Sequence, residues 1–73
     1  MNKRDKIIQK EVYGTASGRK LFEMLKKYFK YEQNIENVIY LLETEANRQK
    51  MIKFLKEGQR TVDEIHYYTA ELE

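Results

Sequence analysis

Apolar side chains recur at the α-helical spacing through most of the chain. The clearest stripe occupies positions i, i+1, i+4, i+7 and i+8, which are Leu21, Phe22, Leu25, Tyr28 and Phe29. Because an α-helix turns once every 3.6 residues, these positions share one broad face. The stripe predicts a helix over residues 16–31, with Thr15 or Ser17 as its N-cap.

A second stripe predicts a helix over residues 35–43. Asn34 precedes it in the position of an N-cap, and its apolar positions are Ile35, Val38, Ile39 and Leu42. Tyr40 and Leu41 widen the apolar surface beyond one face. We therefore expect this helix to be contacted from several sides and to be the central element of the core.

The stretch from residue 51 to residue 65 contains a helix end followed by a helix start. Gly58 is expected to adopt the left-handed conformation that often follows the last helical residue. Thr61 and Glu64 have the spacing of a capping box, in which each side chain bonds the main-chain amide of the other residue. This box predicts a final helix over residues 61–72.

Thr44 is the expected N-cap of a third helix over residues 45–57. We favour two helices that meet at Thr44. A single helix from Ile35 to Glu57 is the alternative, because no glycine or proline enforces a break there.

Two helices joined by a short glycine-containing turn formally match a helix-turn-helix, the motif of many DNA-binding proteins. The charges of the second helix oppose this interpretation, because phosphates repel its acidic residues Asp63, Glu64, Glu71 and Glu73. We interpret the turn as a joint that folds an acidic last helix back over the bundle, near the basic helix that begins at Arg19.

Composition favours the same fold class. The 73 residues include 36% charged side chains and no proline, cysteine or tryptophan. Residues 1–13 are basic and carry a weak apolar cluster at Ile7, Ile8 and Val12, which suits an N-terminal arm or a short helix. We predict an all-α, small single-domain bundle of about four short helices over residues 14–73, preceded by this basic N-terminal arm.

Charge is distributed unevenly along the chain. Residues 1–31 hold nine Lys or Arg and three Asp or Glu, a net of +6, whereas residues 32–73 hold five and nine, a net of −4. Such asymmetry indicates either an anionic partner or an internal match between two oppositely charged surfaces. We favour the internal match.

Catalytic and metal-binding chemistry has little basis in this sequence. There is no cysteine, and His66 is the single histidine. Its acidic neighbours do not form a recognised ligand pattern. The run Gly14–Lys20 invites comparison with a phosphate loop, but the glycine spacing is one residue short and Leu21 stands where a hydroxyl should bind magnesium. We predict a protein that is not an enzyme, with no catalytic, metal or cofactor site.

The expected function is a small non-enzymatic protein–protein interaction or regulatory module. The candidate interaction tyrosines are Tyr31, Tyr40 and Tyr67, which lie off the main stripes. The expected partner is a protein, including a second copy of the chain as a homodimer. The alternative is a nucleic-acid-binding accessory protein that uses the basic N-terminal half, with a candidate basic surface at Arg19, Lys20, Lys26, Lys27 and Lys30.

The expected location is the cytoplasm, away from membranes. The longest apolar run, Val38–Leu42, is far shorter than the roughly 20 residues that span a bilayer. Charged residues at the start of the chain are not followed by the long apolar segment of a secretory signal. The lack of cysteine is compatible with a reducing compartment.

Overall fold

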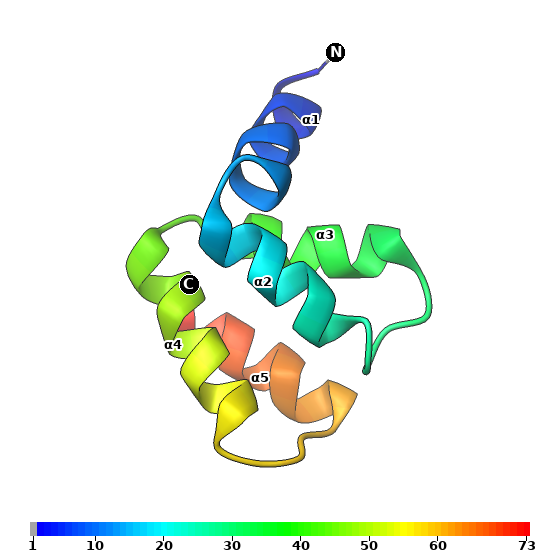
Figure 1. Ribbon diagram of the computed structural model, residues 1–73, viewed down its shortest axis with the longest axis vertical. Helices are drawn as coiled ribbons and strands as arrows, with labels where there is room; N and C mark the ends of the chain where they lie inside the picture. Colours follow the sequence, from blue (N-terminus) through cyan, green and yellow to red (C-terminus); the bar gives the residue numbers. More distant parts are fainter. Residues whose placement is uncertain (1) are drawn as a thin grey trace.

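The computed structural model describes residues 2–73. This part of the chain contains five α-helices and one π-helical stretch, joined by short loops (Figure 1). In chain order they are α1 (Lys3–Ile8), η1 (Gln9–Tyr13), α2 (Ala16–Leu25), α3 (Glu32–Leu41), α4 (Glu45–Lys56) and α5 (Val62–Leu72). The stretch η1 continues α1 directly, so the two form one rod. The predicted all-α class is confirmed. Each helix within residues 2–73 is too short or too polar to cross a membrane.

Threonine hydroxyls start three of the helices, as predicted. Thr15 Oγ1 accepts a hydrogen bond from the Gly18 amide at 2.9 Å, and Thr44 Oγ1 accepts one from the Asn47 amide at 3.1 Å. Two helices therefore meet at Thr44. The capping box at α5 is also present, because Thr61 Oγ1 accepts from the Glu64 amide and the Glu64 carboxylate accepts from the Thr61 amide.

The helix expected over residues 16–31 is shorter than predicted, because α2 ends at Leu25. The amides of Tyr28 and Phe29 both donate to the Leu25 carbonyl oxygen, at 2.9 and 3.0 Å, which closes a turn in place of further helix. Phe29 is still only 8% exposed. The apolar spacing was thus correct for burial, but a turn can also bring side chains at this spacing to the core.

The start of α3 differs from the prediction of a helix over residues 35–43. The helix begins at Glu32, and its N-cap residue is Tyr31, whose side chain makes no capping hydrogen bond. Asn34 lies inside the first turn and is not the N-cap. Glu32 places a negative charge in this first turn, where the helix dipole favours it.

The left-handed conformation predicted for Gly58 is wrong, because no glycine within residues 2–73 has a positive φ. A side chain takes over part of the helix-ending role. Arg60 Nε donates to the Phe54 carbonyl oxygen at 3.0 Å, which satisfies one of the carbonyls left free at the end of α4. The helix predicted over residues 45–57 ends at Lys56.

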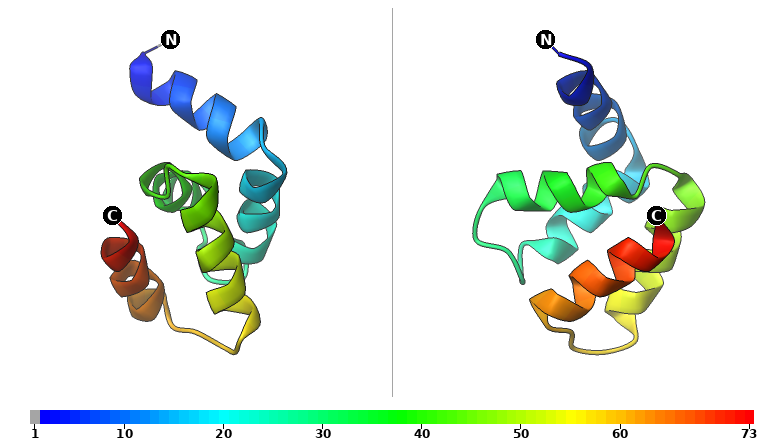
Figure 2. Two further views of the ribbon diagram at one scale, coloured as in Figure 1. Left: turned by 90° about the vertical axis from the view of Figure 1, so that its left-hand side faces the viewer. Right: turned by 180° about the vertical axis from the view of Figure 1, so that it is seen from behind.

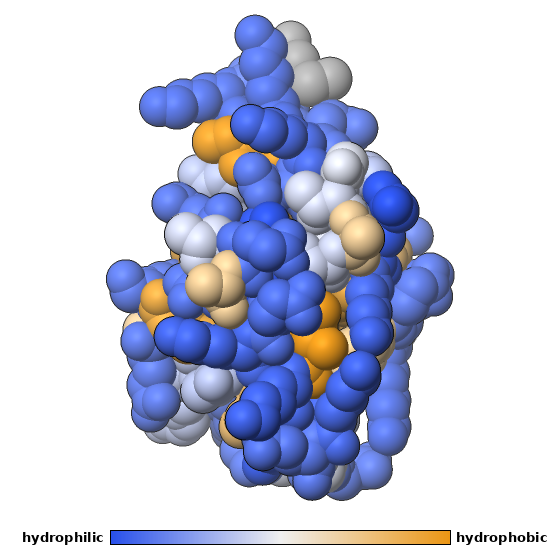
Figure 3. All heavy atoms as spheres, turned by 60° about the vertical axis from the view of Figure 1, so that its left-hand side comes forward, coloured by the Kyte–Doolittle hydropathy of each residue, from blue (hydrophilic) through white to orange (hydrophobic). Residues whose placement is uncertain are grey.

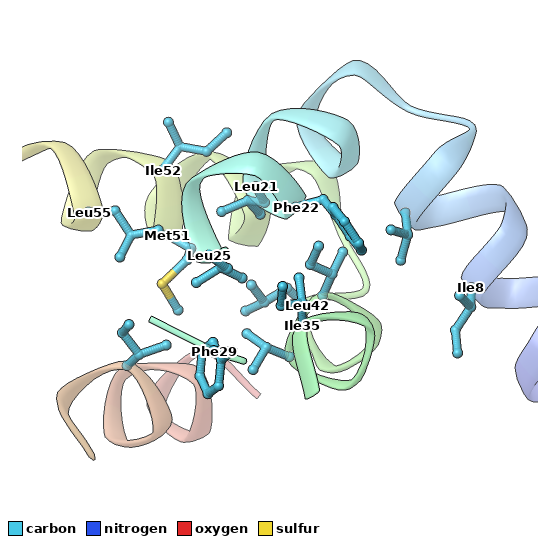
Figure 4. Close-up of a cluster of buried hydrophobic side chains, with 14 residues drawn as sticks. Ile8, Leu21, Phe22, Leu25, Phe29, Ile35, Leu42, Met51, Ile52 and Leu55 are labelled. Atoms are coloured by element: carbon cyan, nitrogen blue, oxygen red, sulfur yellow. The ribbon is translucent and has the colours of Figure 1, made fainter. Parts of the chain in front are cut away.

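The central position predicted for the second apolar stripe is confirmed, because α3 packs against α1, η1, α2 and α5. Leu21 and Leu25 from α2, Met51 and Leu55 from α4, and Ile35 from α3 converge on one core (Figure 4). Ile8 lies at the edge of this core. Together with the buried Val12, it fastens the rod of α1 and η1 to the bundle.

The acidic helix α5 lies away from the basic helix α2. It packs against α3 and α4 and lies on the other side of the core from α2 (Figure 2). The last helix was predicted to lie near the basic helix that begins at Arg19. It does not pack against α2 itself, but His66 of α5 contacts Phe29 in the turn after α2, with ring centres 5.6 Å apart. The reason is that burial of Ile65 and Thr69 positions α5 against the apolar core. Surface charge does not determine which helices α5 packs against.

Candidate interaction surfaces

The structure divides the predicted basic surface of α2 into two flanks. On one flank, Lys20 lies beside Lys56 of α4, and Lys27 Nζ donates to Gln59 Oε1 at 3.2 Å in the loop after α4. On the other flank, Arg19 and Lys26 turn toward η1 and Phe22. Lys30 lies in the turn before α3, with its ammonium 5.6 Å from the ring centre of Tyr31.

The first flank borders a groove between α2 and α4, which run side by side in the same direction. Ser17 bonds the Glu45 carboxylate at the beginning of both helices, and Lys27 bonds Gln59 near their ends. We define the α2–α4 groove by the residues Lys20, Met24, Lys27, Tyr28, Leu55 and Lys56.

The floor of the α2–α4 groove is apolar and slightly hollowed. Met24, Tyr28 and Leu55, with Lys27 at the rim, line a hollow of about 180 Å³. This is smaller than the roughly 300 Å³ at which small-molecule pockets begin, so it suits a single inserted side chain. Methionine is flexible and adapts to different apolar groups, which favours a docking role at this point.

Lysines on the two helices raise the positive charge of the groove. A hydrogen bond between the side chains of Lys56 and Lys20, which requires Lys20 to be the neutral acceptor, lowers the pKa of Lys20. Repulsion from the Lys56 charge lowers it further. Lys56 was missed by the sequence prediction. Its exposed position on α4 was visible in the pattern, but the distance in sequence from Lys20 concealed that the two side chains meet.

The second flank is occupied by contacts within the molecule. The Arg19 guanidinium donates to the Tyr13 carbonyl oxygen at 3.1 Å. Lys26 pairs with Glu23 at 3.2 Å, and its ammonium lies 5.4 Å from the ring centre of Phe22. These contacts leave Arg19 and Lys26 less available to a partner than the lysines of the α2–α4 groove.

The three candidate tyrosines differ in exposure. Tyr31 is 61% exposed and Tyr67 is 75% exposed, so both present most of their rings to solvent. Tyr40 is half-buried against the core, and the Arg4 guanidinium lies 5.2 Å from its ring centre. Tyr40 therefore holds α1 against α3, and the structure offers Tyr31 and Tyr67 to partners.

Arg48 is a buried cation that the sequence prediction missed. It is 3% exposed, and its guanidinium reaches five acceptors. These acceptors are Ser17 Oγ, the carbonyl oxygens of Leu42 and Glu43, and the carboxylates of Glu11 and Glu45. They come from η1, α2, the α3–α4 loop and α4, so this one side chain ties four segments together. The sequence did indicate that Arg48 is buried, because Arg48 lies three residues before Met51 and thus on the buried face of α4.

Ion pairs do not produce the predicted internal match between the basic and acidic halves. Within residues 2–73, the one ion pair between distant segments joins Arg48 of the acidic half to Glu11 of the basic half, at 2.7 Å. In this pair the base comes from the acidic half and the acid from the basic half, which is the reverse of the expected match. Ion pairs within this part of the chain therefore do not join the excess charges of the two halves.

The small-residue run before α2 serves packing and not anion binding. The Ser17 hydroxyl is buried between Glu45 and Arg48, and the Gly18 amide bonds Thr15. His66 packs edge-on against Phe29, with ring centres 5.6 Å apart. Across residues 2–73, no three acidic, histidine or cysteine side chains gather as metal ligands.

A second hollow, of about 390 Å³, lies between the α3–α4 loop and the end of α5. Asn47 Nδ2 donates to the Leu72 carbonyl oxygen at 2.8 Å beside it. The charged residues on its walls are Glu43 and Glu73, with no base among the lining residues. The hollow thus lacks the convergent donors that would orient an anionic ligand.

Comparisons of the chain with protein families, with curated proteins and with solved structures found no match.

Proposed function

We propose that this protein is a small non-enzymatic interaction module of the cytoplasm that binds a protein partner in the α2–α4 groove. The observation that carries the proposal is the combination of an apolar floor at Met24 and Leu55 with lysines on both sides. Protein interfaces have this arrangement of an apolar centre and a charged rim. The cytoplasmic location is supported by the absence of cysteine.

The character of the surface favours a weak and reversible partnership. On the face that includes α4, apolar atoms emerge as small separate patches within a polar surface (Figure 3). Obligate partners bury large continuous apolar areas, whereas transient partners use small and more polar ones. A regulatory contact fits this surface better than a permanent subunit interface.

Photo-crosslinking tests the proposal directly. A photoreactive residue replaces Met24 in the groove, and the same residue replaces the exposed Gln33 on α3 as the matched control. In native lysate, we expect protein adducts from position 24 that survive nuclease treatment and disappear when Lys20→Glu is added. Equal labelling from both positions would overturn the proposal.

Nucleic acid is a second candidate, favoured by the adjacency of Lys20 and Lys56 on a surface that no acidic helix covers. The apolar floor weighs against it, because phosphate backbones require positive charge and gain nothing from Met24 or Leu55. Adducts from position 24 that vanish with nuclease would establish this candidate and exclude the protein partner.

A further inference from the structure

The outer face of α5 carries an exposed tyrosine between two carboxylates. Glu64, Tyr67 and Glu71 are all exposed and stand at i, i+3 and i+7, so they lie along one face of the helix. Tyr67 is 75% exposed, more than any other large apolar side chain within residues 2–73. A ring exposed to this extent between charges is typical of a docking residue.

The charges of this face have no bases near them in the same molecule. Within residues 2–73, no Lys or Arg nitrogen lies within 4.0 Å of a carboxylate of α5. Likewise, no carboxylate oxygen within residues 2–73 lies within 4.0 Å of the ammonium nitrogen of Lys20, Lys27 or Lys56. The nearby acids are already engaged, since Glu23 on the second flank pairs with Lys26 and Glu57 after α4 pairs with Arg60.

The two surfaces match in spacing. Lys20 and Lys27 are seven residues apart on α2 and the turn after it, and Glu64 and Glu71 are seven residues apart on α5. Two helical turns separate each pair, roughly 10.5 Å along the axis. The centre of each surface is also complementary, because the hollow beside Met24 suits one large side chain and Tyr67 offers one.

Geometry prevents one molecule from satisfying both surfaces by itself. Helix α5 lies across the core from α2 and turns its buried residues Ile65 and Thr69 inward, so its exposed face points away from the groove of its own chain (Figure 2). A helix is also the right type of occupant. The backbone groups of α2 and α4 are bonded within their helices, which excludes the addition of a β-strand, whereas a groove between helices accepts a third helix.

We propose that α5 of a second copy of this chain docks in the α2–α4 groove, with Tyr67 in the hollow and Glu64 and Glu71 against Lys20 and Lys27. This inference rests on the proposed function and names the partner. Because α5 lies across the core from α2, the contact is heterologous and leaves one groove and one α5 free in every pair. The chains therefore add head to tail.

The size of the contact sets its strength. A helix of 11 residues is only about 16 Å long, so the interface falls at the small end of protein contacts. We expect association at chain concentrations on the order of 0.1 mM and above, and we expect it to weaken as salt screens the lysine–carboxylate pairs.

Sedimentation velocity with two complementary variants tests the inference. The groove variant carries Lys20→Glu and Lys27→Glu, and the helix variant carries Tyr67→Ser and Glu71→Lys. Both sets lie on exposed helix or turn positions, and a base in the last turn of α5 is favoured by the helix dipole, so circular dichroism should show intact folds. The wild-type average mass should rise above the 8.9 kDa of one chain with concentration and fall with salt.

The two variants distinguish the chain that provides α5 from the chain that provides the groove. Each variant alone should remain a monomer. An equimolar mixture should form a complex of two chains and no larger species, because the intact α5 of the groove variant fills the intact groove of the helix variant. A Met24 photo-crosslink to Tyr67 or its neighbours, mapped by mass spectrometry, should appear in the wild type.

Three results would overturn the inference: a monomeric wild type at about 1 mM chain, well above the concentration at which association is expected, self-association that persists in either variant, or a mixture that stays monomeric. If the wild type stays a monomer while Met24 crosslinks to another protein in lysate, the self-docking inference fails and the proposed interaction function stands. If Met24 captures no protein at all, both fail.

Discussion

At the scale of single residues, Arg48 is the one buried charged side chain within residues 2–73, with a guanidinium that is 3% exposed. Burial of a cation costs several kcal/mol unless hydrogen bonds and an opposite charge compensate for the lost water. The five acceptors around Arg48 provide this compensation, and within residues 2–73 no buried side-chain nitrogen or oxygen lacks a partner. Arginine suits this position because its planar fork presents several donors at once.

Arg48→Ala should reduce the free energy of unfolding by about 3–5 kcal/mol, because it leaves Glu11 and Glu45 without the guanidinium. A chain of this length has a total stability of roughly 4–11 kcal/mol, so much of the fold should be lost at 37 °C. Urea denaturation measures the change. Lys50→Ala, on the exposed face of α4, is the control and should stay within about 0.5 kcal/mol of wild type. A loss below about 1 kcal/mol for Arg48→Ala would contradict this account.

Tyr13 should titrate later than an ordinary tyrosine. Its hydroxyl donates to Glu36 Oε2 at 2.5 Å, and this bond, with burial and the nearby negative charge, raises the pKa of Tyr13 from 10.0 to about 12. Because the folded-state pKa is the higher one, the bond stabilises the fold fully below pH 10 and is lost as the pH rises toward 12.

Spectroscopic titration of the tyrosinates in wild type and Tyr13→Phe tests this directly. The component that appears last in the wild type should be missing from the variant. Since the residue is 38% exposed, the variant should lose less than about 1 kcal/mol of stability at neutral pH. An unchanged late component would show that a different tyrosine is responsible.

At the scale of elements, a glycine in the first turn of α2 and a glycine after the end of α4 have different roles. Gly18 lies where α2 meets η1, and a Cβ there would overlap the Glu11 carbonyl oxygen and come within 2.7 Å of that of Val12. Both contacts are with main chain, which cannot move aside easily. Gly58 follows α4, and a Cβ there would meet nothing within 4 Å.

Gly18→Ala should therefore destabilise the fold by about 1–3 kcal/mol or partly undock η1. Gly58→Ala should leave stability unchanged or raise it by up to about 1 kcal/mol, because alanine reduces the freedom of the unfolded chain. Chemical denaturation of the two variants side by side measures the difference. Similar losses at both positions would mean that conformational freedom, and not close packing, retains these glycines.

At the scale of the whole molecule, the same lysines influence stability and association in opposite directions. Lys20 and Lys56 repel each other in the isolated chain, but together they attract a carboxylate from outside. Proteins often retain such locally unfavourable charges where a partner is bound.

Lys20→Glu should consequently raise the melting temperature, because it replaces repulsion with attraction to Lys56, and should also weaken self-association. Calorimetry and sedimentation on the same sample measure the two effects. The gain in melting temperature should shrink in high salt, which screens exposed charges. A lower melting temperature in low salt would show that Lys20 and Lys56 do not repel each other in the fold.

The sequence by itself determined the all-α class, the three threonine caps, the meeting of two helices at Thr44 and the central role of α3. The helices and their caps depend on interactions between residues a few positions apart, such as the reciprocal bonds of Thr61 and Glu64. The central role of α3 was visible in the width of its apolar surface. Where a local rule had a competitor, the prediction failed. At the end of α4, the Arg60 side chain bonds a free carbonyl, and Gly58 does not adopt the expected left-handed conformation. After Leu25, a turn takes the place of the last part of the helix predicted to reach residue 31.

The tertiary structure alone decided the partners of distant residues. Lys20 meets Lys56 across 36 positions of sequence (56 − 20), and Arg48 meets Glu11 across 37 (48 − 11) and Ser17 across 31. The placement of α5 across the core from α2 is likewise a long-range feature. Such contacts depend on which apolar faces pack together, and burial is non-directional and takes no account of the charges outside. For this reason the sequence revealed two charged halves but not how they pack: the basic rod of α1 and η1 lies against α3, whereas α5 packs against α3 and α4.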